Sequence, residues 1–303
     1  MNIVVTGGTG FLGRPLVERL LAEGHRVAVL TRNPSSSGDR VAGNLVVERW
    51  DGVNVDRWAH RVDGADAVIN LAGDSIGGKR WTPRQKQAIL DSRVDATRAV
   101  VKAISQANTK PAVLVSVSAV GYYGHVESGD VTESHPCGSD FLANVCARWE
   151  DESRKAEAYG VRVVNPRFGV ILARDGGALQ RFLLPFSLFI GGPLGPGTQW
   201  FPWIHHDDAI SLFLFLIQTD SMAGPVNAAA PNPATMKDFC SALGKALRRP
   251  SWAPVPSFVL RALLGEMSSI VLTGQRVVPK KLLQSGYAFR YPELDLALNA
   301  ILS

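Results

Sequence analysis

Three glycines at fixed spacing form the strongest chemical signal in this chain. Residues 4–13 read VVTGGTGFLG, so Gly7, Gly10 and Gly13 follow an apolar run and open an amphipathic one. Gly7 permits a tight turn, Gly10 lets the backbone approach a pyrophosphate, and Gly13 lets the next helix pack closely on a sheet. The free N–H groups and positive dipole end of that helix would face the phosphates. The pattern predicts dinucleotide binding; the alternative is a structural turn beside an empty crevice. The expected pyrophosphate contacts are Gly7, Thr9, Gly10, Phe11, Leu12 and Gly13.

The end of the second apolar run indicates which dinucleotide fits. An acidic residue about 20 positions beyond the glycines would hold the ribose 2′-OH of NAD. The stretch VLTRNP has no Asp or Glu there and carries Arg32 instead. The planar fork of an arginine suits a 2′-phosphate. We therefore expect NADP(H) rather than NAD, the alternative being that Arg32 is a solvated loop charge.

Further cofactor contacts are expected where apolar runs end, because open α/β sheets bind ligands at the carboxyl ends of their strands. Asp51 in RWDG could reach the adenine, or it could simply form an Asx turn. Leu71, Ala72 and Gly73 in NLAG must pass close to the cofactor. Arg93, on the helix flanking the crevice, could touch the cofactor or an anionic substrate, the alternative being a surface ion pair.

The elements that would position these residues alternate between strand and helix. Amphipathic stretches such as Leu12–Glu23 and Pro83–Gln106 separate the short β-branched runs, which predicts an α/β fold, a doubly wound parallel Rossmann sheet covered on both faces. Thr82 followed by Pro83 is a favourable helix start. The expected strands are Ile3–Val5, Val27–Leu30, Val46–Val47, Ala67–Leu71, Val113–Val117 and Arg162–Asn165.

Sequence texture changes after Arg174, where glycine and proline become dense in GGPLGPGTQWFPW. We assign residues 1–170 to the dinucleotide-binding domain, rejoined by 204–230. Residues 171–203 and 231–303 would form a smaller C-terminal substrate lobe. Residues 35–38 are expected to form a mobile loop.

Composition excludes several classes of protein. The chain has 303 residues, a net charge of +5 and no run of five basic residues, which argues against nucleic acid. Its three cysteines form no CxxC pair, which favours reduced thiols and a cytoplasmic setting over zinc. No secretory signal is visible, and the apolar stretch Leu212–Ile217 is too short to span a bilayer. We expect a small-molecule substrate, no membrane partner, and a monomer or homodimer.

A family resemblance rests on motifs in a fixed order: TGGTGFLG, NLAG, SVSAVGYYG, PRFGVIL and WIHHDD. The chain resembles the extended short-chain dehydrogenase/reductases. RWTPRQKQAILDSRVDATR, GGPLGPGTQWFPWIHHDD and the tail RVVPKKLLQSGYAFRYPEL make it more similar to the NAD(P)-dependent epimerase-like group, often labelled sugar-nucleotide epimerase or SulA-type, with a C-terminal domain of unknown function. The resemblance implies a Rossmann fold and bound NADP(H), and adds Pro166 and Arg167 to the expected cofactor contacts.

The family's usual acid–base residues are missing. In the wider superfamily a lysine lowers the pKa of a tyrosine that passes the proton, and a serine holds the substrate oxygen. Ser118 stands at the serine's position. In SDFLANVCARWE (139–150), Phe141 or Leu142 replaces the tyrosine, and Val145 or Cys146 replaces the lysine. A thiol in an apolar helix is usually inert, so this helix is expected to keep its structural role alone.

Groups that could replace the missing tyrosine and lysine are expected on the opposite wall of the crevice. Tyr122 and Tyr123, just past Ser118, are expected at its mouth, where a phenol with a pKa near ~10 would be a hydrogen-bond donor rather than an acid–base group. The alternative for both is loop packing. Glu133 could face the pocket or serve as a loop or cap carboxylate. The catalytic candidates are Ser118, Tyr122 and Tyr123.

Two remaining stretches have structural and functional interpretations. In WIHHDD, Asp207 or Asp208 is expected to cap a helix, so no metal site is expected. Gln199, Trp200 and Trp203 would line a substrate pocket or form a structural lid. Two functions stay open: an NADP-dependent epimerase or oxidoreductase with a non-standard active site, or a non-enzymatic NADP(H) redox sensor or protein-interaction factor.

Overall fold

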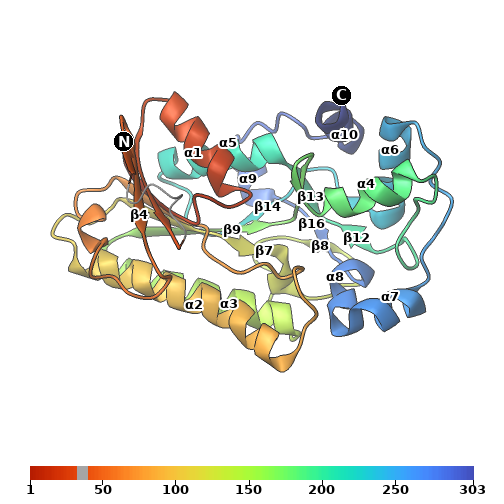
Figure 1. The fold of residues 1–303 in the computed structure, drawn as a ribbon, viewed down its shortest axis with the longest axis horizontal. Coiled ribbons are helices and arrows are strands. Elements are labelled where there is room, and N and C mark those ends of the chain that lie inside the picture. Colours follow the sequence, from red (N-terminus) through yellow and green to blue (C-terminus); the bar gives the residue numbers. More distant parts are fainter. Residues whose placement is uncertain (33–39) are drawn as a thin grey trace.

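The main sheet has nine strands and confirms the doubly wound Rossmann class. The structure, a computed structural model, describes residues 1–32 and 40–303, so the expected loop at 35–38 lies outside it (Figure 1). In spatial order the strands are β14 (Gly224–Ala228), β9 (Arg162–Phe168), β6 (Val113–Ser116), β5 (Ala67–Asn70), β1 (Asn2–Thr6), β2 (Arg26–Thr31), β4 (Leu45–Arg49) and β3 (Arg40–Ala42), with β7 (Ser118–Ala119) paired to β9. Neighbours are parallel except β3, which runs antiparallel to β4.

Helices cover both faces of this sheet, because alternate strand residues point to opposite sides and both sides are apolar. Ile3 and Val5 face α1 (Gly13–Ala22) and α5 (His206–Gln218), whereas Val4 faces the core under α2 (Pro83–Gln106). The helix α3 (Phe141–Arg154) lies beside α2 (Figure 1). β1 lies between β2 and β5. The connections that follow β1 and β5 run to opposite sides of the sheet, and this reversal leaves a crevice at the carboxyl ends of the two strands.

Capping residues set the starts of the two long helices. The Thr82 hydroxyl accepts a hydrogen bond from Gln85 N at 3.2 Å, and Pro83 occupies the first helical turn. The Asp140 carboxylate accepts from Ala143 N at 2.8 Å and starts α3. Both caps satisfy N–H groups that have no partner inside the helix.

A smaller lobe with three short sheets lies at the other end of the molecule from the N-terminus (Figure 1). Its elements are β8 (Asp130–Val131), β10 (Val170–Ala173), β11 (Gly176–Gly177), α4 (Leu179–Ser187), β12 (Trp200–Phe201), β13 (Trp203–His205), β15 (Ala234–Thr235), α6 (Met236–Leu247), α7 (Ser257–Leu264), η4 (Gly265–Ser268), α8 (Ser269–Leu272), β16 (Arg276–Val277) and α10 (Leu294–Leu302). The 3-10 turns η1 (Ala59–Arg61) and η3 (Lys155–Tyr159) lie against α2, η2 (Val120–Tyr123) lies against α3, and α9 (Lys280–Gln284) lies against β14.

The tail of the chain returns to the main sheet and is not confined to the lobe. Leu282 and Tyr287 lie in the core beneath the sheet. The Asp208 carboxylate accepts from the backbone N–H groups of Arg290 and Tyr291, at 2.7 and 3.0 Å. The Tyr287 hydroxyl donates to Asp208 O at 2.7 Å. Asp208 therefore fastens the C-terminal segment to the start of α5.

We predict that Gly13→Ala destabilises the protein by about 1–3 kcal/mol, because overpacking of a rigid backbone contact costs that much. A Cβ at Gly13 would overlap the Gly7 carbonyl oxygen and would also meet the Gly8 backbone. Urea unfolding measures the loss. Gly78→Ala is the matched control, because its Cβ would meet only Ser75 at ordinary contact distance. Equal midpoints for the two variants would contradict the close packing of turn and helix.

Candidate functional site

A cavity of about 340 Å³ lies at the carboxyl ends of β1, β2 and β5 and collects much of the predicted cofactor site. Gly7 has a φ of +68°, in the region that favours glycine. A Cβ there would lie 3.0 Å from the Leu71 carbonyl carbon, so the two strand ends approach closely. Of the predicted cofactor residues, the cavity is lined by Gly7, Thr9, Gly10, Arg32, Asp51, Leu71, Ala72 and Gly73.

Arg32 lines this cavity, paired with a residue that the sequence analysis did not select. Its NH2 lies 3.1 Å from Asp74 Oδ1, and the Arg32 side chain is 67% exposed. An exposed ion pair of this kind contributes little, about 0–1 kcal/mol. A ligand phosphate could therefore replace the Asp74 carboxylate as the partner of Arg32.

Asp51 lines the cavity but its carboxylate forms a turn. Asp51 Oδ1 accepts from the N–H groups of Asn54 and Val53 at 2.8 and 2.9 Å, and Oδ2 accepts from Asn54 Nδ2. These bonds, led by the Asn54 N–H, lower the pKa of Asp51. The geometry matches the Asx-turn alternative, and the adenine contact stays a prediction.

A buried polar network occupies the wall where the family's acid–base pair would stand. Leu142, Cys146 and Glu150 follow one another at four-residue steps along α3 and so share one face of the helix. The Ser118 hydroxyl donates to Glu150 Oε1 at 2.7 Å. Arg167 closes on the same carboxylate through Nε at 2.8 Å and NH2 at 2.7 Å. The sequence analysis did not select Glu150 as a site residue. Its position four residues after Cys146, and so on the same face of the helix, could have indicated it.

The two candidate tyrosines have different surroundings. The expected place of Tyr123 at the crevice mouth is wrong, because its side chain is only 1% exposed. Its hydroxyl donates to Asn227 Oδ1 at 2.5 Å and accepts from Arg167 NH1 at 2.9 Å, and burial raises the pKa of Tyr123 to about 12. Tyr122 is half-buried, with its ring 3.4 Å from the Arg167 guanidinium carbon, and its hydroxyl bonds to no described residue. Tyr122 is therefore the phenol that remains able to donate to a ligand.

Burial also decides the roles of Arg167, Pro166 and Glu133. Arg167 is 2% exposed and bonded to Glu150 and Tyr123, so its predicted cofactor contact is replaced by a structural ion pair. Pro166 is also buried, within β9 beside Val226. Glu133 Oε1 accepts from the backbone N–H groups of Asn227 and Lys281 at 3.2 and 3.1 Å, which is the loop-carboxylate alternative.

Arg93 and Cys146 lie near one another on facing helices. The Arg93 guanidinium carbon lies 5.1 Å from the centre of the Trp149 ring, and NH1 donates to Ile89 O at 3.0 Å. A Cβ on Gly73 would lie 3.1 Å from the Arg93 guanidinium carbon, so the Arg93 side chain packs against the segment that follows β5, as expected. Among the described residues Arg93 forms no salt bridge, so the alternative of a surface ion pair is not seen. Burial raises the pKa of Cys146 to about 12, which makes its thiol a weak acid and a poor nucleophile at neutral pH.

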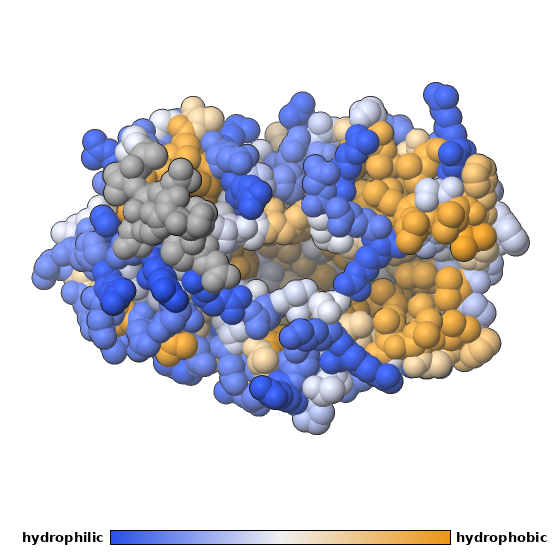
Figure 2. Space-filling view, viewed as in Figure 1, coloured by the Kyte–Doolittle hydropathy of each residue, from blue (hydrophilic) through white to orange (hydrophobic). Residues whose placement is uncertain are grey.

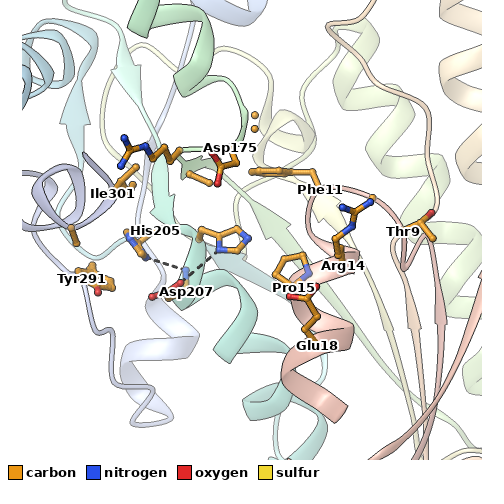
Figure 3. Close-up of a pocket in the computed structure, with 17 residues that line it drawn as sticks. Thr9, Phe11, Arg14, Pro15, Glu18, Asp175, His205, Asp207, Tyr291 and Ile301 are labelled. Carbon is orange, nitrogen blue, oxygen red and sulfur yellow. Dashed lines mark hydrogen bonds and ion pairs between the residues drawn. The ribbon is translucent and has the colours of Figure 1, made fainter. Parts of the chain in front are cut away.

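A second cavity, of about 700 Å³, adjoins the glycine turn between α1 and the C-terminal segment (Figure 3). Phe11 lies on its wall against the β11 hairpin, where a Cβ on Gly176 would overlap the ring. His205, rather than Asp207 or Asp208, caps α5: its Nδ1 accepts from Asp207 N at 3.0 Å. Within 1–32 and 40–303 no three His, Cys, Asp or Glu side chains are grouped as metal ligands.

The three residues expected to line a substrate pocket are divided by the fold. Trp203 is 1% exposed and belongs to the lobe core. Gln199 Nε2 donates to Leu194 O and Val271 O, both at 2.8 Å, and so joins two lobe segments. Trp200 is half-buried under Arg276. The structure thus gives Gln199 a structural role within the lobe and Trp203 a place in its core.

The sheet, the glycine turn and the cavity at the switch point define a dinucleotide-binding protein of the short-chain dehydrogenase/reductase type. A family model described as "NAD dependent epimerase/dehydratase family" matches residues 3–229, and one described as "Domain of unknown function" matches residues 255–301. The chain belongs to this epimerase/dehydratase family, which confirms the resemblance inferred from its motifs.

Named relatives cover the whole chain. An Arabidopsis thaliana protein, "Epimerase family protein SDR39U1 homolog, chloroplastic", is 44% identical over 100% of this chain and 87% of its own. "Epimerase family protein YfhF" of Bacillus subtilis is 40% identical over 100% and 98%. The crystal structure of human epimerase family protein SDR39U1 with NADPH is 34% identical, with a TM-score of 0.88 over 100% of this chain and 99% of that one.

We predict that lowering the pH from 7 to 5 destabilises the protein through His205 by about 1–2 kcal/mol. Burial lowers the pKa of His205 to about 4. The pKa of the same side chain in the unfolded chain is about 6.5. At a pH between these two pKa values only the unfolded chain binds the extra proton, so the free energy of unfolding decreases as the pH falls through this range. Denaturant midpoints at both pH values measure the loss. His205→Gln should reduce it, and the exposed control His60→Gln should not. An unchanged loss in His205→Gln would contradict the assignment.

Proposed function

We propose that the protein binds NADP(H) and acts as an epimerase-like or oxidoreductase-like member of its family with a non-standard active site. The observation that supports this proposal is the position of Arg32 on the cavity beside the glycine turn, where an NAD-specific site would place a carboxylate. The NADPH named with the human relative agrees with it. A bound nicotinamide would give or take a hydride.

The residues left to act on a substrate are Tyr122, Arg93 and Ser118. Tyr122 offers a phenolic O–H that no described residue uses. Arg93 supplies a positive charge on the side of α3 where Cys146 stands in place of a lysine, and it would bind an anionic substrate group or a developing oxyanion. Ser118 donates its proton to Glu150 and so presents lone pairs to a ligand N–H or O–H. The substrate is expected to be a nucleotide sugar or another carbonyl compound.

A second function follows from the apolar residues at the two catalytic positions. Leu142 and Cys146 cannot supply the usual proton transfer, and Glu150 is held by Arg167. A protein that binds NADP(H) and reports its redox state to a partner would need neither residue. This non-enzymatic role is the alternative to catalysis.

The setting of the protein is part of the proposal. Cys137, Cys146 and Cys240 are free thiols, which fits a reducing cytoplasm. Across the described part of the chain no helix is both long and apolar enough to cross a membrane. We expect a monomer or a homodimer acting on a small molecule, without nucleic acid.

Calorimetry should find NADPH binding more tightly than NADH, and Arg32→Ala should reduce that preference by about tenfold or more, the effect of one lost charge-assisted pair. Asp74→Asn is the matched variant: it removes the carboxylate that pairs with Arg32, so the NADPH preference should be kept or increased. Equal affinities for NADPH and NADH in the parent protein would contradict the role of Arg32.

If the protein turns over a substrate from a panel of carbonyl compounds and nucleotide sugars, Tyr122→Phe and Ser118→Ala should each lower kcat/KM by about a hundredfold, a typical effect of losing one positioned hydrogen-bonding group from an active site. Cys146→Ser should be nearly silent because the thiol is buried and protonated. If Cys146→Ser abolished turnover in a protein that still folds, the active site would lie on α3 and the assignment to Tyr122 and Ser118 would be wrong. NADPH binding without turnover of any panel member would favour the sensor.

A further inference from the structure

Large apolar side chains gather in the open at one end of the lobe. Figure 2 shows two hydrophobic areas there, where Figure 1 places α4, α6, α7 and α8. Large exposed apolar patches usually mark an interaction surface. We call the surface the apolar end; its side chains are each 36–72% exposed and are Leu184, Leu188, Phe189, Ile190, Trp252, Phe258, Leu263 and Ile270.

The two areas of the apolar end belong to adjoining segments of the chain. Trp252 Nε1 donates to Phe189 O at 2.8 Å, and Trp252 N donates to Gly191 O at 3.1 Å, so the segment after α4 lies beside the segment that leads into α7. A β-bridge between Leu194 and Val255 extends this contact. The two hydrophobic areas therefore belong to elements that are fastened to each other.

Local structure holds these side chains outward. Phe189 has a φ of +62°, a strained conformation for a residue with a side chain, and strain of this kind tends to be kept where it serves a function. Arg249 lies 4.5 Å from the centre of the Phe189 ring. In α7 only Leu260 is buried, so Phe258 and Leu263 cover no core of this chain.

The charges around the apolar end are mostly positive. Residues 179–203 and 236–272 contain six basic side chains and two acidic ones, Asp238 and Glu266. Asp238 is engaged in the capping box of α6, and Glu266 pairs with Lys86 at 2.6 Å. The basic residues are Arg181, Lys237, Lys245, Arg248, Arg249 and Arg261.

We propose that the apolar end docks on the surface of a bilayer that contains anionic lipid. Exposed phenylalanine, tryptophan and leucine beside lysine and arginine are typical of segments that lie at the headgroup boundary. Basic side chains are attracted to anionic headgroups, whereas a second copy of this chain would bring like charges together. This proposal departs from the absence of a membrane partner that the sequence predicted, because these side chains become neighbours only in the fold. The contact is peripheral and does not depend on the proposed function.

Co-sedimentation with vesicles tests this proposal. The full chain should bind vesicles of phosphatidylcholine mixed with phosphatidylglycerol, should bind pure phosphatidylcholine more weakly, and should be released by salt. The double variants Phe189→Ser/Phe258→Ser and Arg248→Glu/Arg249→Glu should each lower the partition coefficient by about tenfold or more. Tyr159→Ser and Arg57→Glu, which change exposed residues outside the apolar end, are the matched controls.

Folding and assembly are checked on the same proteins. Thermal unfolding of the double variants should match the parent, since the changed side chains are exposed. Failure of the parent to bind the mixed vesicles, or equal binding by the double variants, would overturn the proposal. A dimer seen by sedimentation equilibrium that Phe189→Ser/Phe258→Ser dissociates, without vesicle binding, would assign the surface to a second copy and would also overturn it.

Discussion

The ion pair between Arg167 and Glu150 is the interaction on which the arrangement of the site depends. Both side chains are 3% exposed and meet through two hydrogen bonds. A charge so deeply buried is tolerated only when its partner is in place, because desolvation without compensation is far more costly than the pair is stabilising. Strand β9, helix α3 and the turn after β7 must therefore hold one relative position. Ser118 and Tyr123 complete the satisfaction of the two charged groups.

This requirement explains why the helix with the missing tyrosine and lysine survives. Glu150 lies on the same face of α3 as Leu142 and Cys146, so the helix still carries a polar group that the sheet needs. Loss of the acid–base pair upstream leaves the buried network intact. Tyr122 and Arg93, two of the polar groups proposed to act on a substrate, lie on elements outside α3. Under the proposed function, a substrate would meet these groups rather than the face of α3 that carries the family's usual chemistry.

Backbone geometry shapes the cofactor cavity, whereas side-chain contacts fasten the C-terminal segment to the main domain. At the glycine turn, the close approach of Gly7 to Leu71 and of Gly13 to Gly7 leaves room for a ligand only because no Cβ intervenes. Between the main sheet and the C-terminal segment, Asp208 of α5 binds the backbone N–H groups of Arg290 and Tyr291, and Glu133 binds those of Asn227 in β14 and Lys281 in α9. These carboxylates join segments that a helix or strand could not join by itself.

The sequence by itself determined the features that depend on local spacing. The glycine turn, the alternation of strands and helices, the Thr82 cap and the absence of the tyrosine and lysine all follow from residues a few positions apart. Only the tertiary structure decided which side chains meet across long separations: Tyr123 with Asn227, 104 residues away, Arg167 with Glu150, and Phe189 with Trp252. The physical reason is that burial and hydrogen-bond partners depend on how whole elements pack. Periodicity therefore predicts that a residue faces a core, and the fold determines which partner it finds there.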